Sequence, residues 1–333
     1  RSLSGIDRPP TWTSVPLGPI EYRCLAISDD GDYLVAGGTG ESVYYWAGAK
    51  GIPPGSSNVP TTWSVTFHPG IMVEAVDLSS DGDYVVAGTT GHSVAYWKNA
   101  RSRTDLNSDP NWVSTKLNSA LSVVDVAVSD DGNYVVAASH SMTGAVYYWA
   151  DATGLSDDPE TKWYEELWAG QIFTSVDMSS DGTSVIAGAS VGVYFWGGAR
   201  TLTGKPETES WKYPTAASVW DVAINSAGDY MAAADGTRYV YFLDNKGSLK
   251  WQYGPLSNTP FVLSISSDGG TLAIGTGLVA SRYLVSTGYR TPTPRAVGGI
   301  LLQADKLALL SPWLAVALAA VAVTVFAAKR RKP

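Results

Sequence analysis

Reactive and metal-binding side chains are scarce in this 333-residue chain. It has one cysteine, Cys24, and three histidines, and charged residues make up only 16% of it. One cysteine excludes an intramolecular disulfide, and its place in a strand-like stretch indicates a small buried side chain. The sequence also lacks a phosphate-binding glycine loop, a nucleophile elbow, a cysteine pair and a His-Glu-x-x-His motif. We therefore expect neither an enzyme nor a bound cofactor.

Positive charge is also in short supply outside the C-terminus. The formal net charge is -8, and Lys329, Arg330, Arg331 and Lys332 contribute +4, so the remaining chain carries -8 - 4 = -12. Nucleic-acid binding needs a basic surface, so the acidic body argues against it. No Asn-x-Ser/Thr sequence for N-glycosylation is present either.

A repeated segment dominates the rest of the sequence. Residues 79–88 (SSDGDYVVAG) recur six times with small changes, and the turn glycines are Gly31, Gly82, Gly132, Gly182, Gly228 and Gly269. Their spacings are 51, 50, 50, 46 and 41 residues. Such periods are typical of propellers and solenoids, in which each repeat is one supersecondary unit.

Each repeat predicts four short antiparallel strands. In the second copy they cover residues 73–78, 84–87, 93–97 and 111–117, with Asp81 and Gly82 in a tight turn between the first two. Tryptophan and tyrosine, 13 and 18 in number, recur at equivalent positions of the third and fourth strands, which favours packing between blades. Four strands per repeat make one blade of a β-propeller.

The two ends of the repeat region complement each other. Residues 11–17 (TWTSVPL) match a fourth strand, while the last copy, residues 262–287, has only three. We therefore predict an all-β, six-bladed β-propeller closed by the N-terminal strand, because closure removes two free sheet edges. The alternative is an open stack of sheets.

The motif Ser-x-Asp-Gly-x-Tyr-Val-Val-Ala-Gly, followed by Val-Tyr-Tyr-Trp at 43–46, resembles the WD40, YVTN and quinoprotein-like β-propeller superfamily. Residues 243–251 (LDNKGSLKW) are similar to one quinoprotein repeat. The resemblance covers about residues 11–290 and implies the fold, but not an activity, because propellers host many functions. The Gly-His and Trp-Asp pairs do not recur in the repeats as they do in WD40 repeats, and no catalytic residue carries over.

Four aspartates recur in the predicted first strands, which line the central channel of a propeller. Asp77 and Asp177 share one position, and Asp125 and Asp221 share another two residues earlier. A cluster of these carboxylates would bind a cation or a basic group. The alternative, which we favour, is that each accepts backbone N–H groups of a neighbouring blade. His92 and His140 lie in equivalent loops and would be either metal ligands or plain loop residues.

The connections between third and fourth strands differ in length. They cover residues 47–62, 98–110, 150–162, 197–210 and 244–249. They share a face with the Asp-Gly turns, and we expect this face to be acidic. It would contact a partner, because functional loops vary where scaffold turns repeat. The alternative is that these loops are only solvated connections.

The C-terminal region predicts a membrane anchor. Residues 291–306 form a Pro- and Gly-containing linker, and residues 307–328 are a 22-residue run without charge, long enough to span about 30 Å of hydrocarbon. Ser311, Pro312 and Trp313 suit its start, and the basic residues at 329–333 indicate a cytoplasmic end. A stripe of small residues predicts packing on another membrane helix: Ala315, Ala319, Ala320, Thr324 and Ala328.

The predicted layout is a leader segment (1–10), a propeller (11–290), the linker, the helix and the basic tail. The order of spacer, apolar run and basic tail resembles the C-termini of prokaryotic, including archaeal, surface proteins. We expect a non-catalytic interaction scaffold at the outer face of the cell membrane, with other membrane-protein subunits as partners. A glycan- or ligand-binding sensor and, less favoured, a quinoprotein-like enzyme are the alternatives.

Overall fold

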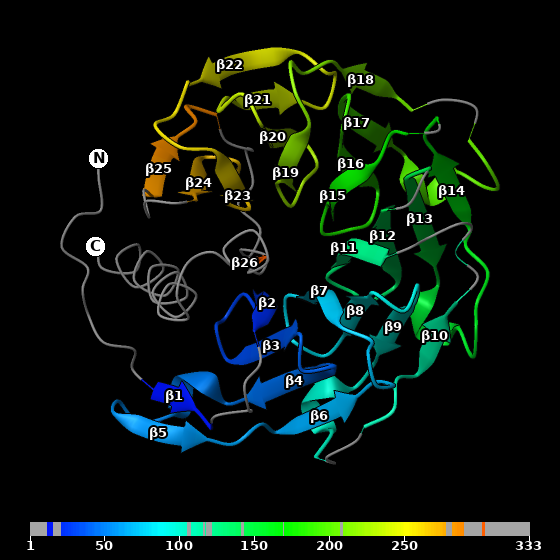
Figure 1. Cartoon of the computed structure of the whole chain (residues 1–333), viewed down its shortest axis with the longest axis vertical. Helices are drawn as coiled ribbons and strands as arrows, with labels where there is room; N and C mark the ends of the chain where they lie inside the picture. The colour runs from blue at the N-terminus through cyan, green and yellow to red at the C-terminus, as the bar shows by residue number, and fades with distance from the viewer. Residues whose placement is uncertain are drawn as a thin grey trace.

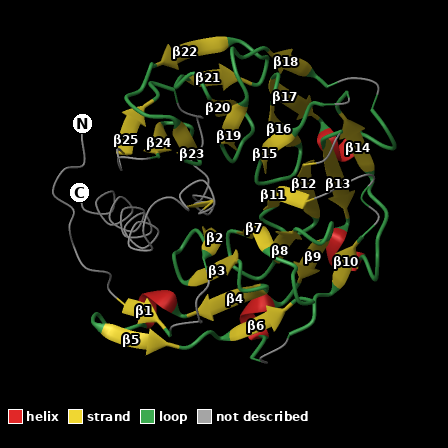
Figure 2. Ribbon diagram, in the orientation of Figure 1, coloured by secondary structure: helices red, strands yellow, loops and turns green. Residues whose placement is uncertain are grey.

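Six antiparallel sheets surround a central axis in the computed structural model of the chain (Figure 1). The structure describes residues 12–15, 21–104, 108–115, 117, 122–140, 143–168, 170–206, 209–277, 282–289 and 302–303. Nearly all the regular structure is strand (Figure 2). In every sheet the first strand, here called A, lies nearest the axis, and strands B, C and D follow outward. The fold is thus the predicted arrangement of propeller blades.

The first three blades have all four strands. Blade one contains β2 (Tyr22–Ile27), β3 (Tyr33–Gly38), β4 (Ser42–Ala47) and β6 (Trp63–Thr66). Blade two contains β7 (Val73–Leu78), β8 (Val85–Thr89), β9 (Val94–Trp97) and β10 (Trp112–Ser114). Blade three contains β11 (Ser122–Val128), β12 (Tyr134–His140), β13 (Ala145–Ala150) and β14 (Trp163–Glu166).

The other three blades follow the same order. Blade four contains β15 (Phe173–Met178), β16 (Ser184–Ala189), β17 (Gly192–Gly197) and β18 (Trp211–Tyr213). Blade five contains β19 (Val219–Ile224), β20 (Tyr230–Asp235), β21 (Val240–Asp244) and β22 (Leu249–Tyr253). Blade six contains β23 (Pro260–Ile265), β24 (Thr271–Thr276) and β25 (Arg282–Ser286), three strands among the described residues.

Two faces of the ring follow from this strand order. The turn face carries the A–B turns and the C–D connections, and the D–A face carries the B–C and D–A connections. Four C–D connections begin with a short 3₁₀ turn: η1 (Ala49–Gly51), η2 (Ala100–Ser102), η3 (Ala152–Gly154) and η4 (Ala199–Thr201). Each follows a residue in the left-handed region, such as Gly48 (φ 74°) or Asn99 (φ 58°), because the chain must turn sharply as it leaves strand C.

Apolar cores lie between successive blades. Five clusters join blade one to two, two to three, three to four, four to five and five to six. The tryptophans of strands C and D supply the largest fully buried side chains, among them Trp63, Trp97, Trp112, Trp149, Trp163 and Trp196. The prediction that the repeated aromatics pack between blades is therefore confirmed.

Polar tips of these aromatics also bind the next blade. Tyrosine hydroxyls of strand C donate to carbonyls of the following A–B turn: Tyr45 to Gly82, Tyr96 to Gly132 and Tyr148 to Gly182, at 2.7–2.8 Å. Strand-D indoles donate to the following C–D connection or its equivalent: Trp63 to Ala100, Trp112 to Ala152, Trp163 to Ala199, Trp211 to Asn245 and Trp251 to Thr287. Tyrosine and tryptophan recur here because each fills a core and satisfies a buried carbonyl.

The turn glycine is required by conformation and by space. Gly132 has φ +69°, and an added Cβ would lie 2.2 Å from the ring of Tyr84 in blade two. Gly82 and Gly182 meet Tyr33 and Tyr134 in the same way. The tyrosine of the repeat motif therefore packs under the turn of the next blade, which explains why glycine and tyrosine recur together.

The N-terminal strand does not complete blade six, so that prediction is wrong. β1 (Trp12–Ser14) pairs in parallel with β5 (Ser56–Val59), a strand inside the C–D connection of blade one. Trp12 packs beside Trp46, with ring centroids 6.5 Å apart, and joins a small core on the side of blade one that faces away from blade two. Burial of this apolar side of blade one is the physical reason for the different pairing.

One further strand lies beyond blade six in sequence. β26 (Leu302–Gln303) pairs antiparallel with β2, with Gln303 opposite Cys24 and Leu302 opposite Leu25. It lies on the inner side of blade one, near the centre of the ring (Figure 1). Part of the segment predicted as a linker therefore forms a strand.

Candidate functional site

The A strands surround the central channel and share an irregularity. In every blade the B-strand register skips one residue near the start of strand A, which is the signature of a β-bulge. The skipped residues are Arg23, Glu74, Val124, Thr174, Trp220 and Phe261. The same β-bulge thus recurs in all six blades, with a different residue at the bulge position of each.

These bulge residues lie near the D–A face and contact one another across blade boundaries. The Arg23 guanidinium lies 2.7 Å from both carboxylate oxygens of Glu74. On blades five and six, Trp220 and Phe261 form an edge-to-face pair with centroids 5.3 Å apart, and Trp220 is 37% exposed. Period-two patterning hides these residues, because a bulge changes which side of the strand a residue occupies.

The four predicted channel aspartates each connect two blades. One carboxylate oxygen of each accepts a backbone N–H from the A strand of the following blade. The donors are Val128 to Asp77 (2.8 Å), Val176 to Asp125 (2.9 Å), Ile224 to Asp177 (2.9 Å) and Leu263 to Asp221 (2.6 Å). Four successive junctions, between blades two and three, three and four, four and five, and five and six, therefore each have one such carboxylate.

The second oxygen of these carboxylates is also used in three cases. Asp125 accepts from the N–H of Val126, and Asp177 from that of Met178. Asp221 accepts from the hydroxyl of Ser175 at 2.8 Å. The geometry therefore agrees with the favoured expectation, in which these groups satisfy backbone donors of neighbouring blades.

Burial changes the acidity of these groups. It raises the pKa of Asp77 well above its usual range. The hydrogen bond from the backbone N–H of Val128 lowers this pKa, and the charge of Asp177 raises it. Burial likewise raises the pKa of Asp177 to about 7, although the N–H groups of Ile224 and Met178 lower it. Desolvation exceeds hydrogen bonding at both sites, so the pKa of each carboxyl lies above the usual range of an aspartate.

A cavity of about 90 Å³ lies between these carboxylates and the A–B turns. Its polar lining consists of Asp77, Asp130, Asp177, Asp221, Ser80, Ser180, Ser226, Ser264 and Ser267. Burial also raises the pKa of Asp130. Asp29 lies in the equivalent turn of blade one, and burial, with the charges of Asp130 and Asp30, raises its pKa to about 8.

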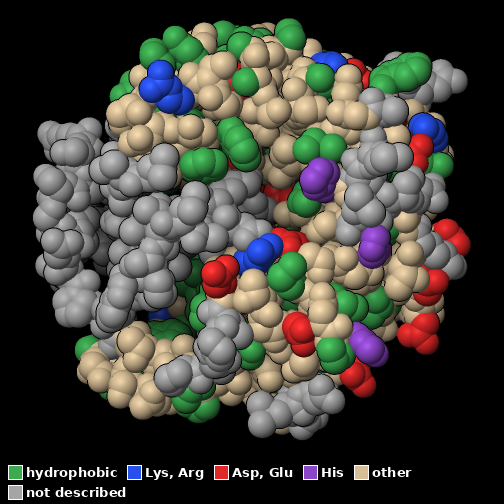
Figure 3. Space-filling model, viewed as in Figure 1, with side chains coloured by type: hydrophobic (Ala, Val, Ile, Leu, Met, Phe, Trp, Pro, Cys, Tyr) green, Lys and Arg blue, Asp and Glu red, His purple; other side chains and the backbone are tan. Residues whose placement is uncertain are grey.

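A metal site finds no support within the part of the chain that the structure describes. It contains no group of three or more His, Cys, Asp or Glu side chains arranged to hold an ion. His92 lies in the connection between β8 and β9, and His140 ends β12. Both are on the D–A face, where Figure 3 shows the histidine side chains toward the viewer.

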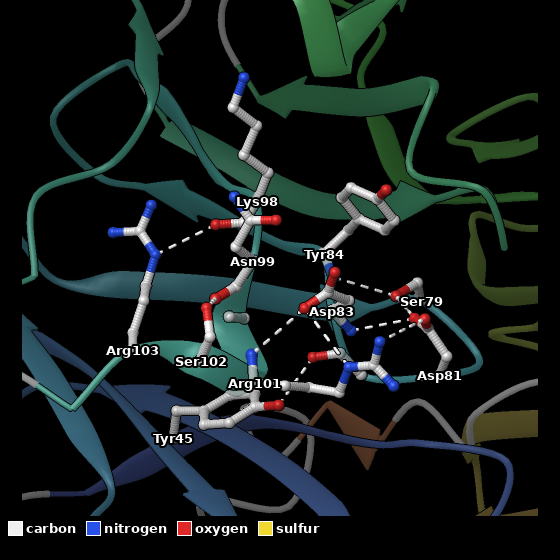
Figure 4. Close-up of polar contacts among 12 residues, drawn as sticks. Tyr45, Ser79, Asp81, Asp83, Tyr84, Lys98, Asn99, Arg101, Ser102 and Arg103 are labelled. Carbon is white, nitrogen blue, oxygen red and sulfur yellow. Dashed lines mark hydrogen bonds and ion pairs between the residues drawn. The ribbon is translucent and has the colours of Figure 1, made fainter.

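The carboxylates of the A–B turns are engaged in the turn itself. In blade two, Asp81 accepts from the hydroxyl of Ser79 (2.8 Å) and from the N–H of Asp83 (3.0 Å). Arg101, from η2, lies 3.4 Å from the carboxylate of Asp81 and 3.4 Å from that of Asp83 (Figure 4). Its guanidinium carbon also lies 5.9 Å from the ring centroid of Tyr33 in blade one. The acidic turns are thus partly neutralised, and their repetition reflects turn chemistry.

A second arginine binds the C–D connection of blade two. Arg103 donates to the carbonyls of Lys98 and Asp109 and to the side chains of Ser108 and Asn111, at 2.6–3.1 Å. Burial slightly outweighs the charge of Asp109 and lowers the pKa of Arg103. The described parts of this connection, residues 98–104 and 108–111, are therefore joined to each other on the turn face.

The predicted anchor residues lie outside the described residues. They are Pro312, Trp313, Ala315, Ala319, Ala320, Thr324, Ala328, Lys329, Arg330, Arg331 and Lys332. Within the described ranges, no helix is long and apolar enough to cross a membrane.

The aromatic rings on which a glycan-binding role was considered are mostly buried between blades. Among the described residues the exposed large aromatics are Trp168 (85%), Tyr253 (43%) and Trp220 (37%). All three lie where strands D end or strands A begin, which places them on the D–A face.

Comparison with known proteins gives one family match. Residues 18–47, which contain β2, β3 and β4 of blade one, match the family described as WD domain, G-beta repeat. No curated protein matches the chain. WD40 repeats commonly form non-catalytic interaction scaffolds. The six sheets form a β-propeller-like ring, and the match shows that blade one is similar to a WD40 repeat.

Proposed function

We propose that this chain is a non-catalytic interaction scaffold, held at the outer face of the cell membrane by its C-terminal segment. The observation that carries the proposal is the contrast between a repeated core and unequal C–D connections. The cores and blade links repeat from blade to blade, whereas the connections on the turn face range from residues 48–62 in blade one to 245–248 in blade five. Loops of this kind present binding residues on a rigid scaffold.

The membrane part of the proposal comes from the sequence of residues 307–333. The uncharged run at 307–328 is long enough to span a bilayer, and Lys329, Arg330, Arg331 and Lys332 favour a cytoplasmic end. The propeller then stands outside. The small residues Ala315 and Ala319, with Ala320, Thr324 and Ala328, would let the segment pack on a helix of a partner subunit.

Two measurements on the full-length chain test the two parts separately. Alkaline carbonate extraction of native membranes should leave the chain in the pellet, and its complete release would refute the anchor. A photo-crosslinking residue at Ser156, exposed in a C–D connection, should capture a specific protein, with Gly70 on the D–A face as the comparison position. Recovery of an uncrosslinked monomer from native membranes would refute the scaffold role.

A further inference from the structure

The direction of β26 shows which face of the ring its C-terminal end approaches. Strand A of each blade runs from the D–A face to the turn face, so β2 begins at the D–A face. Because β26 is antiparallel to β2, the chain runs through this pairing from Leu302 to Gln303 toward the D–A face. The uncharged run begins at residue 307, four positions after Gln303. Four extended residues span about 14 Å at most.

The same face carries the exposed aromatic side chains. Trp168 lies in the connection from β14 to β15, Tyr253 ends β22, and Trp220 follows the first residue of β19. Their exposed fractions are 85%, 43% and 37%. Leu249, at the start of β22, is the one other large apolar side chain with comparable exposure among the described residues, and it lies on the turn face.

Trp220 lies near the start of β19, the innermost strand of blade five. It packs edge-to-face on Phe261, and Gly236 lies close to it, since an added Cβ at Gly236 would be 3.2 Å from the indole nitrogen. Hydrophobic side chains are visible over blades five and six on this face (Figure 3). Tryptophan and tyrosine favour the interface between water and hydrocarbon, because one end of each ring is apolar and the other polar.

We propose that the D–A face of the propeller lies against the lipid bilayer, with Trp168 and Trp220 at the depth of the headgroups. The short tether from Gln303 keeps this face close to the membrane, and the aromatic side chains bind the interface. The turn face, with its unequal C–D connections, is then directed away from the membrane and is accessible to partners. This orientation rests on the proposed membrane anchor.

The test uses the full-length chain in phosphatidylcholine vesicles. Trp168→Cys and, as a matched control on the turn face, Ser156→Cys are each made in a Cys24→Ala background and labelled with the same fluorophore. Both positions are exposed, whereas Cys24 is 1% exposed. A nitroxide attached to the lipid headgroup should quench the label at position 168 several-fold more strongly than the label at 156.

The outcomes separate the orientation from the anchor. If the chain does not float with the vesicles, both the anchor and the orientation are overturned. If it floats but the two labels are quenched equally, or position 156 more strongly, the anchor stands and the orientation is wrong. An aqueous quencher should show the reverse order, and equal access of that quencher to both labels would also refute the orientation.

Discussion

The hydroxyl of Tyr96 offers a direct test of how the blades are joined. It is fully buried and donates to the carbonyl of Gly132 in the next blade at 2.8 Å. Tyr96→Phe removes this bond and keeps the ring, which stacks on Trp112 with centroids 5.1 Å apart. A phenyl ring fits this place, because Phe195 holds the equivalent position in blade four and stacks on Trp211 at 4.9 Å.

The expected loss follows from the carbonyl that is left behind. A hydrogen bond contributes about 1 kcal/mol net, and an unsatisfied buried acceptor costs about 1–3 kcal/mol. No water replaces the hydroxyl readily in a packed core, so we expect Tyr96→Phe to lower the free energy of unfolding by about 1–3 kcal/mol. For a domain of this size each 1 kcal/mol lowers Tm by about 2–4 °C.

The control is Tyr84→Phe in the same blade. Tyr84 also packs between blades, but its hydroxyl makes no hydrogen bond among the residues that the structure describes. Its replacement should change the free energy of unfolding by no more than about 0.5 kcal/mol. Urea unfolding followed by tryptophan fluorescence measures both variants. Equal midpoints for Tyr96→Phe and Tyr84→Phe would show that the link to Gly132 does not stabilise the ring.

Two further predictions concern the turn and the channel. Gly132→Ala should lower the free energy of unfolding by more than about 2 kcal/mol, because it combines a positive φ with a steric clash. The control Gly154→Ala should be nearly neutral, because an added Cβ there meets nothing within 4 Å. Thermal unfolding compares the two variants, and similar losses of stability would contradict the role of the Tyr84 contact. Since the pKa of Asp177 is raised to about 7, the folded state binds its proton more tightly than the unfolded state. The contribution of Asp177 is therefore complete below pH about 4 and is lost as pH rises through about 7. Asp177→Asn should reduce the fall in Tm between pH 5 and pH 8, expected to be about a few degrees, and an unchanged pH profile would refute the assignment.

The blades, their number and their inter-blade contacts could be predicted from the repeat. The predicted strand at residues 73–78 coincides with β7, and strand C of blade two begins one residue later than predicted, at Val94. These features are local, because a strand of alternating residues, a turn glycine and a buried tryptophan depend on neighbours at fixed positions of the repeat. The four channel aspartates could also be predicted from their recurrence, although only the structure shows which backbone N–H groups donate to them.

Features outside the repeat could not be predicted in this way. Residues 11–17 match a fourth strand, which predicted pairing with blade six. Instead Trp12 packs on Trp46 of blade one and β1 pairs with β5, and the repeat pattern does not show which blade buries this strand. The exposed Trp220 was missed since a bulge shifts its side chain out of the period-two pattern.

The sequence by itself determined that this protein is built from six propeller blades and contains an uncharged run followed by basic residues, since both are patterns of neighbouring residues. The tertiary structure alone decided where the N-terminal strand pairs, which blades each carboxylate connects and which face carries the exposed aromatics. Those outcomes depend on contacts between residues far apart in the chain, and on bulges that redirect side chains. For the same reason, the direction of β26 relative to β2 was needed to infer which face of the ring lies toward the membrane.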